Sequence, residues 1–307
     1  MDIIKKELPP KYKKVIKEGQ IYLTIKTTGL QKVKNSIYGI GYAYLEDGKP
    51  KYTILNSLLV HEEYILIQKF IEDTKDSNII TTYYGNTFDL PFLVEKMEIY
   101  DFTLPPHYED DMYILVKTLK DELKLKSMSK KHIGDFFQIA EPPLDGKKEI
   151  QLYKQALTNK SESKLNIELI ENTRKSLFLL LELKHRILPL EEEYLILKKD
   201  PFYRINHCKI QGDYLQIKGF TTDEKKEIYH QSITLKTNKE SESFFLEFPV
   251  KSAPYDKERR CYYTLDQKLI NYSSIPFPKE VYPLKLGKIY ILKNIKEIAE
   301  TYLKELL

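Results

Sequence analysis

The chain has 307 residues, which exceeds the usual size of one domain and favours two, each able to bury its own core. Its 42% hydrophobic, 31% charged and 12% aromatic composition excludes a disordered chain. The net charge of +4 is too small to indicate a nucleic-acid binder by itself, although residues 198–307 hold the excess, with 20 basic against 15 acidic residues.

Two features bear on the location of the protein. The longest apolar runs fall short of the roughly 18 residues of a membrane span, and the first ten residues lack a signal-peptide core. We therefore expect a cytoplasmic protein with no membrane partner. Cys208 and Cys261 occur without a Cys-x-x-Cys pair or a nearby His cluster, so zinc is unsupported and two buried, unpaired thiols are expected.

The first part of the chain predicts a mixed α/β domain. The expected elements are a helix at 11–18, strands at 21–26, 38–45 and 51–58, a helix at 61–74 and a strand at 78–83. The second and third strands are joined by an Asp-Gly pair, which is a strong hairpin signal. This order begins a five-stranded mixed sheet flanked by helices.

The remaining elements predict a second, β-rich domain. Further helices are expected at 91–100, 111–123 and 127–137, with Ser127 as the N-cap of the last. A long apolar-periodic stretch at 165–197 contains Pro189, so we expect one helix that stops or kinks before the proline and a short second helix. Alternating aromatic and β-branched runs then predict antiparallel strands and a final amphipathic helix at 291–307. The expected domains are 1–195 and 200–307.

Two segments resemble RNase H-like exonucleases of the DEDD type. Ile21–Leu30 reads Ile-Tyr-Leu-Thr-Ile-Lys-Thr-Thr-Gly-Leu and resembles the Asp-x-Glu-Thr-Thr-Gly-Leu opening of that family. Tyr83–Leu93 contains Gly-Asn-Thr-Phe-Asp-Leu-Pro-Phe-Leu, which is similar to its Asn-Gly-x-x-Phe-Asp-Leu-Pro-Phe-Leu element. The stretches beginning at Asp111 and at Lys148 look like the bacterial YprB-like branch. The resemblance covers about residues 20–190 and implies an RNase H-like fold.

The resemblance implies four metal-binding acids, and this chain keeps one of them. Thr24 and Lys26 stand at the two strand positions, Asp89 follows the second motif, and Lys175 stands at the aligned position of the final helix. Two-metal nucleases hold Mg²⁺ or Mn²⁺ with carboxylates, so one acid in place of four predicts a poor metal site. We expect a pseudoenzyme with a degenerate site, no catalytic residues and no cofactor.

We interpret the lysines as fixed cations that replace the metal ions. Lys26 and Lys175 would converge on Asp89 and leave a cleft that attracts phosphate but does not activate water. The expected partner is a single-stranded nucleic acid or a nucleic-acid-processing protein. The substrate-binding candidates are Lys26, Thr27, Thr28, Asn86 and Lys175.

Several alternatives remain open from the sequence. Asp89 could cap the helix opened by Pro91, and Glu171 could form a surface ion pair with Lys175. The face of the strand that carries Thr24 and Lys26 could be solvated. An active metal-dependent 3′–5′ exonuclease would need a displaced Mg²⁺ or Mn²⁺ site built from Asp89 and Glu171. A protein-binding scaffold or regulator would need neither metal nor nucleic acid.

Overall fold

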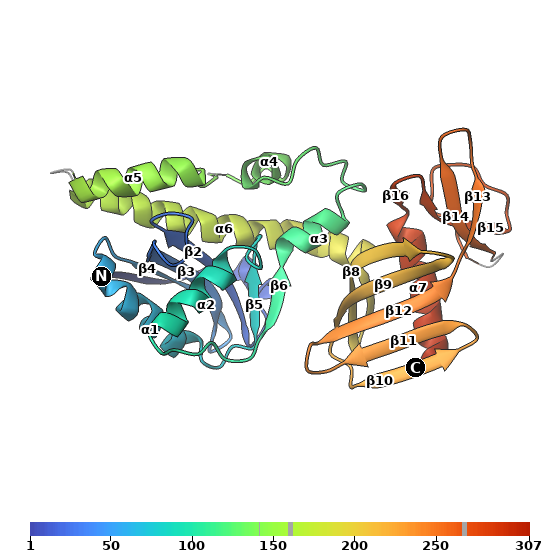
Figure 1. The fold of residues 1–307 in the computed structure, drawn as a ribbon, viewed down its shortest axis with the longest axis horizontal. Coiled ribbons are helices and arrows are strands. Elements are labelled where there is room, and N and C mark those ends of the chain that lie inside the picture. The colour runs from blue at the N-terminus through green and yellow to red at the C-terminus, as the bar shows by residue number, and fades with distance from the viewer. Residues whose placement is uncertain (141, 159–161, 266–268) are drawn as a thin grey trace. The chain divides into compact units, whose positions relative to one another are not determined.

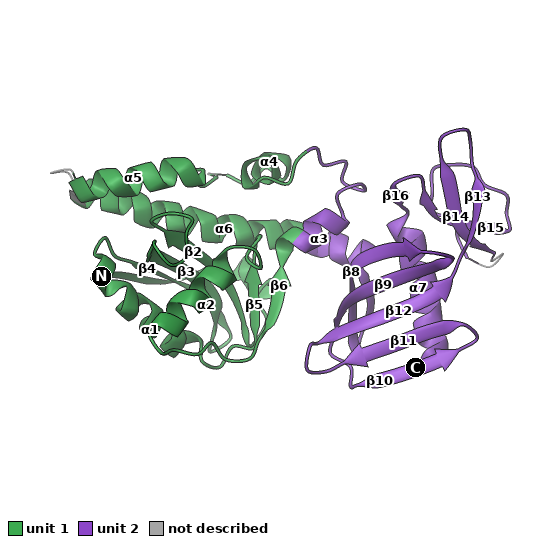
Figure 2. Ribbon diagram, viewed as in Figure 1, with its two compact units in different colours: residues 1–113, 127–187 green, residues 114–126, 188–307 purple. Residues whose placement is uncertain are grey.

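The protein is described by a computed structural model that covers residues 1–140, 142–158, 162–265 and 269–307. The chain separates into two compact units (Figure 2). Unit 1 comprises residues 1–113 and 127–187, and unit 2 comprises residues 114–126 and 188–307. Whether residues 1–195 and 200–307 are independent folding domains stays a prediction.

Unit 1 is built on a six-stranded sheet with the strand order β1-β4-β3-β2-β5-β6 (Figure 1). Strand β2 pairs antiparallel with β3 and parallel with β5, so the sheet is mixed and the expected α/β class is confirmed. The strands are β1 (Asp2–Glu7), β2 (Gln20–Thr27), β3 (Ile37–Glu46), β4 (Lys49–Asn56), β5 (Ile79–Thr82) and β6 (Tyr108–Asp111).

The sheet has one strand more than the five expected. Two edge strands have no counterpart among the predicted elements. They are β6, which pairs with β5, and β1, which pairs with β4 along its whole length. All residues of β1 but one are exposed, so the segment has no buried face and no apolar alternation that would mark it as a strand in the sequence.

Helices cover both faces of this sheet. On one face, α1 (Glu63–Thr74) and α2 (Asp89–Ile99) pack on apolar side chains of β2 and β3, among them Leu23 and Ile40. On the other face lie α5 (Gly146–Thr158) and the long α6 (Glu162–Tyr194), as Figure 1 shows. The shorter helices are η1 (Pro10–Lys14), η2 (Val60–Glu62), α3 (Met112–Thr118) and α4 (Lys130–Phe136).

Two local expectations about helix ends differ from the structure. Helix α6 continues through Pro189 to Tyr194, although proline removes one backbone hydrogen bond from a helix. Buried residues on both sides of it, Ile187 and Leu195, anchor the helix and offset that loss. The N-cap of α4 is Ser129, whose Oγ accepts a 3.3 Å hydrogen bond from the His132 N–H, rather than Ser127.

Unit 2 is rich in antiparallel strands, as expected. One sheet has the order β10-β11-β12-β9-β8-β7 and a second has the order β13-β14-β15-β16. The first comprises β7 (Ile196–Lys199), β8 (Phe202–Gln211), β9 (Tyr214–Thr221), β10 (Lys226–His230), β11 (Ile233–Asn238) and β12 (Ser243–Pro249). The second comprises β13 (Lys251–Pro254), β14 (Arg260–Leu265), β15 (Val281–Leu286) and β16 (Ile289–Tyr290).

Unit 2 ends in α7 (Leu292–Leu306), close to the range expected for an amphipathic helix. Cys208 and Cys261 are both buried and unpaired, as the sequence predicts. No helix in the described part of the chain combines the length and the apolar character that crossing a membrane requires.

Candidate functional site

The face of β2 that carries Thr24 and Lys26 is buried. The two residues are 4% and 6% exposed, which excludes a solvated rim. Helix α6 lies against this face because β3 has glycines there. A Cβ on Gly41 would lie 3.2 Å from the Thr173 Cγ2 and 3.3 Å from the Thr24 Cγ2, so the absence of a side chain sets how closely the helix approaches.

Lys26 is paired with Glu149, a residue that sequence reasoning did not select. The Lys26 Nζ lies 2.9 Å from the Glu149 Oε2, and the Tyr38 hydroxyl donates a 2.6 Å hydrogen bond to the Glu149 Oε1. Burial lowers the pKa of Lys26, although the carboxylate of Glu149 raises it. Both members of the pair are buried, so neither charge is compensated by water.

One sequence signal could have pointed to Glu149. It lies on the stripe of α5 that also holds Leu152, Tyr153 and Ala156, all of them buried. These positions follow the i, i+3, i+4, i+7 spacing of one helix face. An acid on an apolar stripe predicts a buried cationic partner, but it does not say which lysine supplies it.

Asp89 is the first residue of α2 and is 7% exposed. The N-cap position is Phe88, so Asp89 is not the N-cap of α2. Burial raises the pKa of Asp89 from 3.8 to about 6, and the charges of Lys130 and then Lys26 oppose that shift. The carboxyl group is therefore poorly solvated and has two cations in its surroundings.

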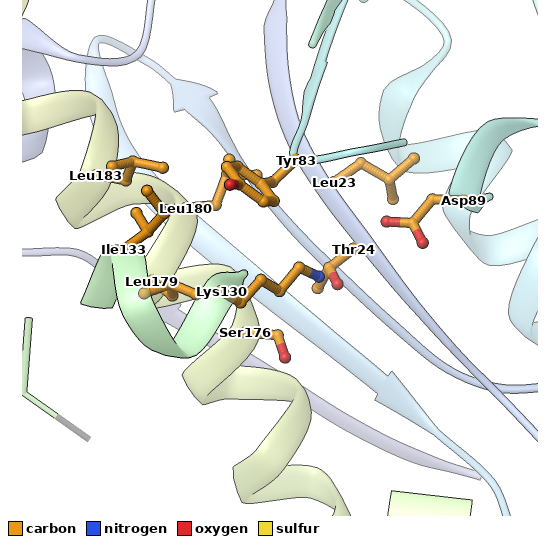
Figure 3. Close-up of a pocket in the computed structure, with 10 residues that line it drawn as sticks. All are labelled: Leu23, Thr24, Tyr83, Asp89, Lys130, Ile133, Ser176, Leu179, Leu180 and Leu183. Atoms are coloured by element: carbon orange, nitrogen blue, oxygen red, sulfur yellow. The ribbon is translucent and has the colours of Figure 1, made fainter. Parts of the chain in front are cut away.

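Lys130 at the start of α4 is the cation that lies in the pocket of Asp89. Figure 3 shows its side chain extending towards Thr24, with Asp89 on the far side of the same pocket. A larger cleft of about 550 Å³ also contains Asp89 and Lys130, together with Lys26 and Glu149. The structure thus brings two carboxyl groups, those of Asp89 and Glu149, and two lysines to one site. Of these four residues, Glu149 and Lys130 are the two that sequence reasoning missed.

Helix α6 contributes Ser176 rather than Lys175 to this site. Ser176 lines both cavities, and its buried Oγ has no hydrogen-bond partner among the described residues. Lys175 lines a different pocket with Lys11, Glu182 and Arg186. Adjacent residues of a helix point about 100° apart, so a shift of one position moves the side chain to another face. The expected convergence of Lys26 and Lys175 on Asp89 is therefore not what the structure contains.

Glu171 also lies away from Asp89. The Arg174 Nε donates a 2.8 Å hydrogen bond to the Glu171 Oε2, and this contact lowers the pKa of Glu171. Glu171 lines neither of the cavities that contain Asp89. Within residues 1–140, 142–158, 162–265 and 269–307, no group of three or more His, Cys, Asp or Glu side chains could hold a metal ion.

The remaining predicted binding residues lie at the rim of the site or in its loops. Thr27 lines the larger cleft and donates a 2.8 Å hydrogen bond to the Gly29 carbonyl oxygen. Thr28 accepts a 3.0 Å hydrogen bond from the Ser36 N–H and closes the loop after β2. Asn86 is exposed.

Asp111 fixes the loop that carries Asn86. The Asp111 Oδ1 accepts hydrogen bonds from the Tyr84 N–H at 2.7 Å and the Tyr113 N–H at 2.9 Å, and the Oδ2 accepts one from the Asn86 N–H at 3.4 Å. Burial raises the pKa of Asp111 even so. Its position at the end of β6 makes it a structural anchor for the loop before α2.

Comparison with known proteins places the first unit in a family. The family model described as RNase H superfamily matches residues 21–186, more than half of the chain. No curated protein matches the sequence. A family B DNA polymerase from the hyperthermophilic archaeon Pyrobaculum calidifontis shares 14% identity at a TM-score of 0.44, over 57% of this chain and 25% of the polymerase. A structure described as the apo form of a nuclease shares 12% identity at a TM-score of 0.35, over 59% of this chain and 79% of that one.

Both TM-scores are below 0.5, so neither solved structure supports a conclusion about function. The family match agrees with the mixed sheet and the helices that flank it. The chain belongs to the RNase H superfamily.

Proposed function

We propose that this protein keeps the nuclease fold for binding nucleic acid and has lost metal-dependent hydrolysis. The observation that supports the proposal is the buried ion pair between Lys26 and Glu149. The resemblance to DEDD exonucleases implies a carboxylate ligand at position 26, and this chain has the ammonium group of Lys26 there instead. A second ammonium group, that of Lys130, shares the pocket of Asp89.

The electrostatics of the site oppose a divalent ion. A dication about 4 Å from one ammonium group would meet a repulsion of about 8 kcal/mol at an effective dielectric constant of about 20. Mg²⁺ and Mn²⁺ need several carboxylate oxygens to offset their loss of water. The cleft offers the carboxyl group of Asp89 and that of Glu149, and Glu149 is already paired with Lys26. Without the ions, no group at the site lowers the pKa of a water molecule enough to make it a nucleophile.

The same cleft suits a phosphate backbone. Its lining includes Lys26, Lys130, Lys131 and Lys148, of which Lys131 and Lys148 are exposed. The ion pair between Lys148 and Asp145 spans 4.0 Å between two exposed side chains, so it competes weakly with a phosphate group. Lysine ammonium groups bind phosphate oxygens as point charges, which gives affinity without sequence preference.

Hydrolysis is tested with a labelled single strand incubated with Mn²⁺ or Mg²⁺. We expect no release of nucleotides from the wild-type chain or from Asp89→Ala. Reproducible degradation by the wild type that is absent from Asp89→Ala would establish an active exonuclease and overturn the proposal. A mutant purified in parallel controls for contaminating nucleases.

Binding is tested by fluorescence anisotropy as a function of salt. The double variant Lys130→Gln with Lys131→Gln should bind a single strand more weakly and with a smaller salt dependence. Lys75→Gln is the matched control, because Lys75 is an exposed lysine at the end of α1 and lies outside the cleft. Equal affinity of all variants would mean that the strand binds outside this cleft, which overturns the proposal for the Asp89 site. No affinity in the wild type would favour a protein-binding scaffold.

A further inference from the structure

The first sheet of unit 2 has one covered face and one open face. Its inward side chains, such as Ile217, Leu235 and Leu246, are fully buried. Helix α7 covers this side, and the rings of Tyr302 and Phe248 pack with their centroids 4.9 Å apart. Figure 1 shows α7 behind strands β8 to β12. The alternate residues of the same strands point to the opposite, open face.

Strand register sorts the outward side chains into two rows across five strands. Each residue of a row is the direct cross-strand partner of the next, so the rows are continuous. At about 4.8 Å between strands, a row extends over roughly 19 Å. The first row is His207, Lys218, Phe245, Lys236 and Glu227, and the second is Lys209, Gln216, Glu247, Thr234 and Tyr229.

Aromatic rings and lysines alternate on this face. Phe245 lies between Lys218 and Lys236 on the neighbouring strands, and the Lys218 Nζ is 5.9 Å from the centroid of its ring. Tyr229 is 63% exposed, with the Lys236 Nζ 5.3 Å from its ring centroid. A hollow of about 700 Å³ lies along the first row, which supplies Lys218, Phe245 and Lys236 to its lining, and Lys225 also lines it.

From this arrangement we propose that the open face of sheet β10-β11-β12-β9-β8 binds single-stranded nucleic acid, with bases stacked on Phe245 and Tyr229 and phosphates held by Lys218, Lys209 and Lys225. A single strand has flat bases, which can stack on the aromatic rings, and a regular row of phosphates, which can bind the lysines. The inference uses only residues of unit 2 and does not depend on the function proposed for the Asp89 site.

The charge distribution favours a polyanion over an acidic protein surface. Lys209, Lys218 and Lys225 lie at this face, and the two acids of the rows are already engaged. The Glu227 carboxylate is paired with Lys236 at 2.6 Å, and the Glu247 carboxylate accepts a 2.6 Å hydrogen bond from Gln216. Partial burial and then the charges of Lys117, Lys218 and Lys209 lower the pKa of His207, which indicates a positive potential at this edge.

Binding by stacking and binding by charge alone predict different mutant behaviour. The full chain is titrated into fluorescein-labelled oligothymidylate and oligouridylate of about 15 nucleotides, and anisotropy is followed at several salt concentrations. Phe245→Leu keeps an apolar side chain but removes the stacking surface, and we expect its Kd to rise about tenfold. Lys218→Gln should weaken binding and reduce the magnitude of the salt slope by about 0.7, the value for one phosphate contact on a single strand.

Two control variants carry the same chemical changes elsewhere in unit 2. Lys257→Gln removes an exposed lysine from the turn between β13 and β14. Tyr255→Leu removes an exposed ring that, like Phe245, has a cation near it, since the Arg259 guanidinium lies 5.2 Å from its centroid. Neither should change the Kd by more than about twofold. Circular dichroism of every variant checks that unit 2 remains folded.

The outcomes separate this inference from the function proposed for unit 1. Weaker binding by Phe245→Leu and Lys218→Gln with unchanged binding by Lys130→Gln/Lys131→Gln supports the open face and counts against the Asp89 cleft. Unchanged binding by Phe245→Leu and Lys218→Gln with weaker binding by Lys130→Gln/Lys131→Gln overturns the inference about the open face and leaves the proposal for the Asp89 cleft standing. The inference is also overturned if Phe245→Leu binds with unchanged affinity and phosphatidylserine vesicles displace the labelled strand as well as an unlabelled strand does. That result would identify a surface that binds anions by charge alone.

Discussion

The Lys26 ammonium lies 2.9 Å from the Glu149 carboxylate, and the two residues are 123 positions apart in the chain. The contact joins the central strand β2 to α5, and both residues are buried except for a small part that lines the cleft. Each charge is tolerated because the other is present.

Removing one member of this pair should therefore be costly. Glu149→Gln keeps an acceptor for the Tyr38 hydroxyl but leaves the Lys26 ammonium buried without its anion. We expect the free energy of unfolding to fall by about 3 kcal/mol or more, measured by urea denaturation. Lys26→Met combined with Glu149→Gln should recover much of that loss, because no unpaired charge remains.

The control for the pair is an exposed one in the same unit. Glu7 and Lys49 lie 3.7 Å apart with both side chains about two-thirds exposed, so Glu7→Gln should change stability little. A double-mutant cycle on Lys26 and Glu149 measures the coupling free energy between the two side chains directly. A coupling near zero would mean that the two charges do not compensate each other in solution.

The sequence predicted the local features of unit 1 but not this pair. The hairpin of β3 and β4 was predictable, since Asp47 and Gly48 both adopt positive φ, 53° and 69°, as a tight Asp-Gly turn requires. The helix expected at 91–100 was predictable from Pro91, and α2 begins two residues before that proline, at Asp89. These features depend on residues close together in the chain.

The cations of the site could not be assigned in the same way. Lys130 belongs to a helix of seven residues, and Glu149 lies beyond it on α5. Their meeting with β2 depends on how α4, α5 and α6 pack over the sheet, which no local pattern encodes. To predict that Ser176 and not Lys175 faces Asp89, one must know the rotation of α6 about its axis to within one residue. Apolar periodicity does not give the rotation of a helix that accurately.

The raised pKa of Asp89 predicts how stability depends on pH. The pKa of Asp89 in the folded state is about 6, against an ordinary value of 3.8, so the folded state holds the proton more tightly than the unfolded state. The resulting stabilisation is fully present below about pH 4 and is lost as the pH rises through about 6. A shift of this size corresponds to about 3 kcal/mol.

Asp89→Asn tests that dependence, because the amide cannot ionise. The difference in free energy of unfolding between wild type and Asp89→Asn should move in favour of the variant between about pH 4 and about pH 7. Urea denaturation in the presence of EDTA measures it without interference from metal ions. A difference that stays constant across this interval would show that the carboxyl group is not desolvated.

The close approach of α6 to the sheet predicts a strict requirement for glycine at position 41. A Cβ there would lie 3.1 Å from the Ile54 Cδ1 and 3.2 Å from the Thr173 Cγ2. Gly41→Ala should therefore lower the free energy of unfolding by about 1 to 3 kcal/mol through overpacking. Thermal or urea denaturation measures the loss.

Gly146→Ala is the matched control for this substitution. A Cβ on Gly146, the first residue of α5, would have no atom within 4 Å. This change should leave stability unchanged or raise it slightly, because alanine loses less backbone entropy on folding. Equal effects of the two substitutions would mean that the helix can move away from β3 at no cost.

If the lysine ammonium groups prevent the binding of divalent ions, then acidic residues restored on β2 should allow the site to bind Mn²⁺. In Thr24→Asp with Lys26→Glu, each new carboxylate would line a cavity that also contains Asp89. Without metal, the clustered acids should repel one another and lower the melting temperature. With Mn²⁺ at about 100 times its Kd, the free energy of unfolding of the variant should rise by about 2.7 kcal/mol, whereas that of the wild type should not change.

The control adds Asp89→Asn to the double variant, which should weaken the stabilisation by Mn²⁺. Stabilisation of the wild type by Mn²⁺ that is lost in Asp89→Asn would contradict the proposed role of the lysines.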